Sequence, residues 1–234
     1  MKHYLFLISI ATLAIINSCK KECRKPEDVP VTKIEQEMYD WIVFKPGSYW
    51  IYIDSISGVY DSVYVTNVLL DTSLFINEKK CVEQRNEQIH VFMKSYYQGW
   101  EIRLVGQYNA GVPNSINQIP GMASIFDQNH SGGDGGHSHY MYFPVLQGTV
   151  GQWAFGWTFI RHDTIYSEIE VLGKTYQNVL RVHDNYNMAL GYNTKFYHVK
   201  NIGVIRKEYY EIDRDNPNPR LLHVWELADY KVTQ

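Results

Sequence analysis

The sequence predicts a mainly β domain in which antiparallel strands follow one another along the chain as a meander. From residue 48 onward, apolar and polar residues alternate with the twofold period of half-buried strands. Segments rich in aromatic and β-branched residues also recur in pairs across short turns, and only one short stretch has helical periodicity. We therefore expect an all-β fold whose sheet closes into a barrel or curls strongly round a core.

A short amphipathic helix is expected over residues 33–44, ahead of the strands. Its apolar residues recur at helical spacing at Ile34, Met38, Trp41 and Ile42. Thr32 stands in the N-cap position and Glu35 in the capping-box position, which predicts the start of the helix. Pro46 and Gly47 predict its end.

The strands are expected in pairs, each pair joined by a short turn. The first pair is Tyr49–Asp54 with Tyr60–Leu70, and Ser57 and Gly58 form the turn between them. Further strands are expected at 89–97, 100–105, 164–172, 176–183, 192–199, 202–212 and 221–232. Residues 109–136 form the longest irregular stretch, with a glycine-rich end.

Residues 1–18 have the composition of an export signal. Lys2 precedes an apolar run from Tyr4 to Ile16. Thirteen helical residues span only about 20 Å, whereas the hydrocarbon core of a bilayer is roughly 30 Å thick, so the run suits export rather than membrane spanning. A buried core helix or an uncleaved anchor is disfavoured, because the run has neither a cap nor a polar face.

The end of this run, Ile16-Asn17-Ser18-Cys19, resembles the lipobox of bacterial lipoprotein signal peptides. Asn17 departs from the commonest pattern, whereas the other three positions match. The resemblance implies cleavage before Cys19 and attachment of acyl chains such as palmitate to that residue. The domain plan is then a signal peptide at 1–18, a lipidated polar tether at 19–32 and a single β-rich domain at 33–234.

Four further motifs are spread over most of the chain. They are Phe44–Tyr52 (FKPGSYWIY), Tyr176–Val179 (YQNV), Gly203–Lys207 (GVIRK) and Trp225–Leu227 (WEL). The set is similar to that of uncharacterised, single-domain, β-rich lipoproteins of the phylum Bacteroidota. The resemblance implies a protein of the cell envelope, anchored by lipid at the outer membrane on its periplasmic or its surface face. The motifs specify a fold rather than an activity, and no catalytic residue is transferred from them.

The charge balance and the missing motifs exclude several function classes. Lys and Arg number 22 against 25 for Asp and Glu, a formal net charge of −3, so nucleic acid is not expected as a partner. The sequence has no nucleophile elbow, phosphate-binding loop, dinucleotide fingerprint or HExxH motif. We therefore expect no enzymatic activity.

A histidine-rich segment is the sharpest candidate for metal binding. His130, Asp134, His137 and His139 lie close together in sequence, and three imidazoles with a carboxylate or water suit Zn²⁺. The glycines between them would have to be ordered at an entropic cost, which favours a mobile polar loop over a metal site. No cofactor is therefore expected, and zinc is the alternative.

Aromatic residues at a turn provide the candidate ligand site. Tyr96, Tyr97 and Trp100 gather where two expected strands meet, and flat rings at strand ends can stack on sugars or line an apolar pocket. The competing interpretation is that aromatic residues fill the core. Cys23 and Cys81 could form a disulfide, but we favour a free Cys23 and a Cys81 buried as a small apolar residue.

The sequence thus predicts a lipid-anchored, non-enzymatic module that binds an apolar or glycan-like ligand or interacts with another protein. The alternatives are a metal-binding lipoprotein that uses the histidine-rich segment and a passive subunit of an outer-membrane complex.

Overall fold

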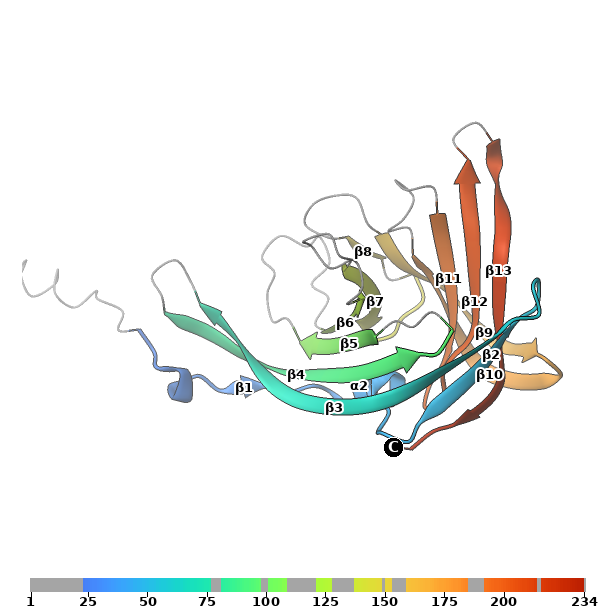
Figure 1. The fold of residues 1–234 in the computed structure, drawn as a ribbon. Helices are drawn as coiled ribbons and strands as arrows, with labels where there is room; N and C mark the ends of the chain where they lie inside the picture. Colours follow the sequence, from blue (N-terminus) through green and yellow to red (C-terminus); the bar gives the residue numbers. More distant parts are fainter. Residues whose placement is uncertain are drawn as a thin grey trace, which may run out of the picture. The chain divides into compact units, whose positions relative to one another are not determined.

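A computed structural model describes most of the chain. It covers residues 23–76, 81–97, 101–108, 121–127, 137–148, 150–152, 159–184, 192–213 and 216–233. Figure 1 draws the chain as a ribbon with its strands labelled. The chain divides into two compact units. One unit comprises Met1–Pro30 and Leu74–Arg85, and the other comprises Val31–Ser73 and Asn86–Gln234.

The described strands join in one thirteen-stranded sheet. The strands of the first half of the chain are β1 (Val31–Thr32), β2 (Tyr49–Asp54), β3 (Tyr60–Ile76), β4 (Val82–Ser95), β5 (Glu101–Tyr108), β6 (Gly121–Asp127) and β7 (His137–Phe143). Those of the second half are β8 (Val150–Gln152), β9 (Phe159–Val171), β10 (Lys174–Asp184), β11 (Tyr192–Val199), β12 (Gly203–Asp213) and β13 (Asn216–Lys231).

The order of the strands shows two meanders joined at one place. It runs β7-β6-β5-β4-β3-β2-β13-β12-β11-β10-β9-β8, with β1 paired to β4 off this path. Each meander follows chain order, and β2 pairs antiparallel with β13 where they meet. The path ends at two edge strands, β7 and β8, so the described sheet is open. The expectation of a mainly β fold is confirmed, whereas the described sheet does not close into a barrel.

The predicted strands form, with some different limits. β2 and β11 have the predicted limits, whereas β3 runs six residues beyond its predicted end at Leu70. The prediction that residues 109–136 are irregular is wrong in part, because β6 lies within them and pairs with both β5 and β7. β7 and β8 were also missed.

The predicted helix is shorter than residues 33–44. It appears as α2 over Gln36–Ile42, with Glu35 as an extended N-cap that makes no side-chain capping bond. The backbone N–H of Ile34 donates instead to Glu87 Oε2 at 3.0 Å, which holds the chain extended before the helix. Thr32, the predicted cap, lies in β1. The apolar face is confirmed, because all four predicted apolar residues are buried.

The core gathers side chains from α2 and from strands of both meanders. Its fully buried members include Met38, Ile42, Val91, Met141, Phe143, Ile160, Val179, Leu180, Ile205 and Leu227. Burial of such side chains is the main driving force of folding.

The helix packs closely against the sheet at Gly106 in β5. A Cβ atom at this position would lie 2.6 Å from Ile42 Cδ1 and 2.7 Å from Met38 Sδ. These distances are shorter than van der Waals contact, so the absence of a side chain is what lets α2 pack on β5.

We expect Gly106→Ala to lower the free energy of unfolding by about 1–2 kcal/mol through overpacking. Ile42→Val removes the nearest methyl group and should recover part of that loss in the double variant. Urea unfolding of the four proteins measures the coupling. If the two substitutions changed the free energy of unfolding in a strictly additive way, Ile42 of the helix would not pack against Gly106.

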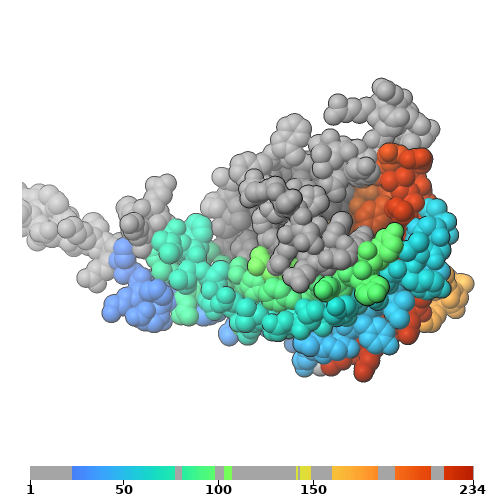
Figure 2. All heavy atoms as spheres, viewed as in Figure 1, coloured from blue at the N-terminus to red at the C-terminus, as the bar shows by residue number. Residues whose placement is uncertain are grey.

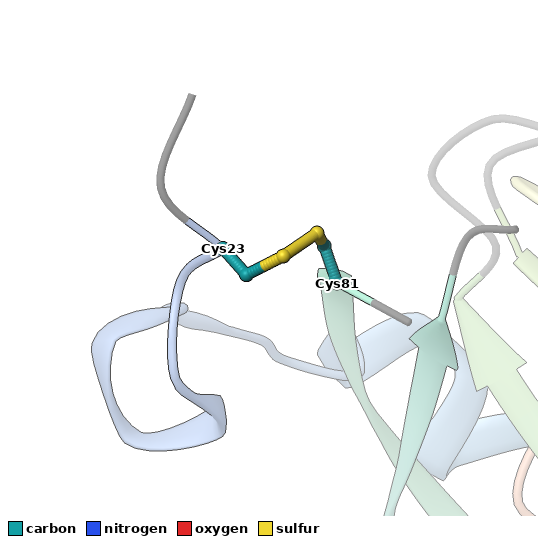
Figure 3. Close-up of a disulfide and its surroundings, with 2 residues drawn as sticks. All are labelled: Cys23 and Cys81. Atoms are coloured by element: carbon teal, nitrogen blue, oxygen red, sulfur yellow. A yellow bond between two sulfur atoms is a disulfide. The ribbon is translucent and has the colours of Figure 1, made fainter. Parts of the chain in front are cut away.

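The smaller unit contains a disulfide between Cys23 and Cys81 (Figure 3). The preference for unpaired cysteines is therefore wrong. Sequence could not supply the decisive fact, which is that the two Cα atoms lie 4.9 Å apart although 58 residues separate them. In the chain-entropy model, closing a loop of this length lowers the entropy of the unfolded chain and so stabilises the folded state by about 4 kcal/mol. In the same unit Arg85 Nη1 donates to the carbonyl of Pro26 at 3.0 Å.

Candidate functional site

Four aromatic rings from both meanders lie together on one face of the sheet. We call Tyr97, Tyr209, His223 and Trp225 the aromatic cluster. The ring centroids are 5.6 Å apart for Tyr97 and Trp225, 6.4 Å for His223 and Trp225, and 6.5 Å for Tyr209 and His223. These separations are those of interacting aromatic pairs.

Strand register explains why three of these rings meet. Tyr209 of β12 lies opposite His223 of β13, and Lys207 lies opposite Trp225. Because side chains alternate along a strand, these four residues share one face of the sheet. Tyr97 comes from the turn after β4 and reaches Trp225 from the other meander.

The cluster combines a buried centre with exposed rings. Trp225 is only 6% exposed, whereas Tyr97 is 56% exposed and the His223 side chain 50%. A molecule at this surface would therefore meet ring faces that are already supported from below. Such an arrangement is typical of binding sites, where rigid aromatic residues supply contact area at low entropic cost.

A buried carboxylate fixes the orientation of His223. Asp54, at the end of β2, is fully buried, and its Oδ2 lies 2.9 Å from His223 Nδ1. Ser57 Oγ donates to the same oxygen at 2.6 Å, and the backbone N–H groups of Val224 and Ile56 donate to Oδ1. Burial raises the pKa of Asp54, but these hydrogen bonds outweigh it and lower the pKa to about 2. The ring of His223 is thus held through Nδ1 and presents Nε2 on its other side.

A second buried carboxylate fixes the turn that carries Tyr97. Asp61, near the start of β3, accepts hydrogen bonds from Ser95 Oγ at 2.9 Å and from the backbone N–H of Tyr97 at 3.0 Å. The backbone N–H of Tyr96 donates to the carbonyl of Ser62 at 2.9 Å. The turn is therefore anchored on β3, which limits the freedom of Tyr97.

Lys207 places an ammonium group on the face that carries the cluster. Its Nζ lies 4.5 Å from the centroid of the Tyr52 ring, within the range of a cation–π interaction. Burial lowers the pKa of Lys207, and the Asp61 carboxylate opposes that shift. A poorly hydrated cation of this kind interacts strongly with an anionic or hydroxyl-rich group that reaches it.

The sequence predicted part of this site. Tyr97 belongs to the cluster, and Tyr96 beside it is exposed, whereas Trp100 lies outside the described residues. The other three members were missed. The alternation of His223, Trp225 and Leu227 could have placed these residues on one face, but not opposite a turn more than a hundred residues earlier.

Most residues of the predicted metal and lipidation sites lie outside the residues that the structure describes. This holds for Cys19, His130 and Asp134, and for the side chains of His137 and His139 in β7. Within the described part of the chain, no three His, Cys, Asp or Glu residues are arranged to hold a metal ion. The described ranges also hold no helix of the length and apolarity needed to cross a bilayer.

The opposite face of the sheet carries a network of charges that bond to one another. Arg206 lies 2.9 Å from Glu208 and 3.4 Å from Glu226. The hydroxyls of Tyr197 and Tyr210 donate to Glu208 at 3.2 and 2.7 Å. Burial, followed by the charge of Glu208, raises the pKa of Tyr197 to about 12. Since these groups bond to each other across β11, β12 and β13, we assign the network a structural role.

A separate hollow of about 500 Å³ lies elsewhere on the larger unit. It is lined by Lys174–Gln177, Val199, Ile202 and Tyr230, and none of these residues belongs to the aromatic cluster. Lys174 Nζ donates to the carbonyl of Ala228 at 2.9 Å, so the cation at this hollow already has a protein partner. The aromatic cluster, with its oriented imidazole and exposed rings, is the stronger candidate.

Comparison with known proteins does not assign the chain to a family. The chain matches no protein-family model, no curated protein and no solved structure.

Two histidines outside the cluster are fully buried. His162 in β9 lies with its Nδ1 3.3 Å from the carbonyl of Leu146, and His198 lies in β11. Burial lowers the pKa of His162 to about 4 and that of His198 to about 3. Both rings are therefore neutral at pH 7.

These rings should make the protein less stable in mild acid. Their folded-state pKa values lie below the ordinary value of 6.5, so the unfolded chain takes up protons first. The stabilisation from keeping the rings neutral is complete above pH 6.5, and it is lost as the pH falls toward 4 for His162 and toward 3 for His198. By pH 5 each ring should lower the free energy of unfolding by about 2 kcal/mol.

Urea unfolding at pH 7.5 and pH 5.0 measures this loss. His162→Gln and His198→Gln should each lose about 2 kcal/mol less than the parent between the two pH values. An equal loss in all three proteins would show that other groups cause the acid sensitivity.

Proposed function

We propose that the protein is a lipid-anchored component of the cell envelope that binds a glycan-like ligand at the aromatic cluster without transforming it. The observation that supports this most directly is the exposed Tyr97 ring beside Trp225, with the imidazole of His223 held by buried Asp54. The anchor is inferred from the apolar run and the lipobox-like sequence that ends at Cys19.

The chemistry of the cluster favours a glycan over a purely apolar ligand. A pyranose ring presents a C–H face that can stack on Tyr97, while its hydroxyls can bond to His223 Nε2. An apolar ligand would cover this imidazole and leave its polar edge without a hydrogen bond, which costs free energy.

The same geometry favours binding over catalysis. In a serine-type triad, the nucleophilic hydroxyl lies against the second imidazole nitrogen of an Asp–His pair. Here the hydroxyl of Ser57 donates to Asp54 instead of to His223. We therefore assign Asp54 the role of orienting the imidazole.

Replacing Tyr97 should weaken glycan binding selectively. In a glycan array or native mass spectrometry screen, we expect Tyr97→Ala to lower affinity by about tenfold or more, since the ring is the exposed stacking surface. Tyr60→Ala is the matched control, because Tyr60 is 60% exposed and shares a strand face with Ile53, away from Tyr52 and Asp61. Equal effects of both changes, or no glycan bound by the parent, would contradict the proposed site.

Lipidation should depend on Cys19. Cells fed radiolabelled palmitate should label the parent protein, and Cys19→Ala should abolish both the label and the recovery of the protein with outer membranes. A parent protein that keeps residues 1–18 and carries no acyl group would contradict the anchor.

A further inference from the structure

The end of β3 exposes three large apolar side chains in succession. Leu74, Phe75 and Ile76 are 44%, 53% and 52% exposed. Successive residues of a strand point to opposite faces, so this end of the strand is apolar on both sides. Scattered exposed apolar residues are ordinary, but a continuous group such as this end of β3, which we call the tip, is typical of a surface that meets another apolar phase.

The disulfide fixes this tip to the tether. Cys81 directly precedes β4, the partner strand of β3, and it is bonded to Cys23. Both segments belong to the same compact unit, so their proximity is a property of that unit. In Figure 2 the teal and green residues where β3 ends and β4 begins lie at the surface beside the blue tether segment.

The tether also sets the distance from the lipid. Cys23 is four residues beyond Cys19, and four extended residues span at most about 14 Å. If Cys19 carries acyl chains in a bilayer, Cys23 stays within that reach of the headgroups, and the disulfide keeps Cys81 and the β3–β4 hairpin next to Cys23. Because the acyl chains already hold the protein at the bilayer through this short link, contact between the tip and the lipid is effectively intramolecular. Even weak apolar contacts are then populated.

We propose that Leu74, Phe75 and Ile76 insert into the bilayer that holds the acylated Cys19, and that the Cys23–Cys81 disulfide holds them there. This inference rests on the proposed lipidation of Cys19. The exposed charges of the tether are of both signs, Arg24 and Lys25 against Glu27 and Asp28, so apolar contact rather than charge drives the insertion. We therefore propose that these side chains contact the lipid surface. The experiment must distinguish this contact from contact with a protein partner.

Photocrosslinking on the full-length lipoprotein tests the proposal. Phe75 is replaced by p-benzoylphenylalanine, and the acylated protein is reconstituted in vesicles of phosphatidylethanolamine and phosphatidylglycerol. The same replacement at Tyr60 is the control, because this aromatic residue is similarly exposed but lies in the other unit. We expect a phospholipid adduct by mass spectrometry at position 75, and at least about fivefold less at position 60.

The disulfide provides the second arm of the experiment. Cys23→Ser keeps Cys19 and should lower the lipid adduct at position 75 by about fivefold, because the tip is no longer tied to the anchor. An undiminished adduct would overturn the role of the disulfide. An acylated protein that gives no lipid adduct at position 75, or gives only protein adducts in cells, would overturn the insertion while leaving the anchor intact. A protein without acyl groups on Cys19 would overturn both.

Discussion

The pairing of β2 with β13 is the constraint on which the candidate site depends. It joins the two meanders, and it places Asp54 opposite Trp225 although 171 positions in the numbering separate them. The hydrogen bond between Asp54 and His223 and the close approach of Tyr97 to Trp225 both rely on this junction. Neither half of the chain contains the site by itself.

Local sequence patterns predicted those elements whose structure depends on neighbouring residues in the chain. β2 alternates buried and half-buried residues along its whole length, and the turn at Gly58 adopts the positive φ that glycine tolerates, so both were predictable. The limits of α2 were not predictable, because the N–H of Ile34 bonds to Glu87, a residue on a distant strand. β6 was missed because its strand state is stabilised by pairing with β5 and β7 rather than by a marked alternation of its own residues.

In the candidate site, too, features that depend on neighbouring residues were predictable, whereas contacts between distant segments were not. Tyr97 stood out because aromatic residues gather at a turn, a local feature of the sequence. His223 and Trp225 could be placed on one face of a strand, but the turn that they meet depends on strand order. The disulfide is a similar case, since nothing near Cys23 in the sequence indicates that Cys81 lies beside it. Chemistry that depends on two distant segments requires the three-dimensional arrangement.

The junction of β2 with β13 also determines when the sheet can be completed during synthesis. β2 ends at residue 54 and β13 begins at residue 216, so more than 160 residues must be made before the two can pair. At ribosomal rates of about 5–20 residues per second, that interval lasts roughly 8–32 s. Throughout it, β2 lacks one of its two neighbours and leaves a backbone edge open to wrong partners. The edge of β2 therefore stays available for wrong pairing until the last strand is complete.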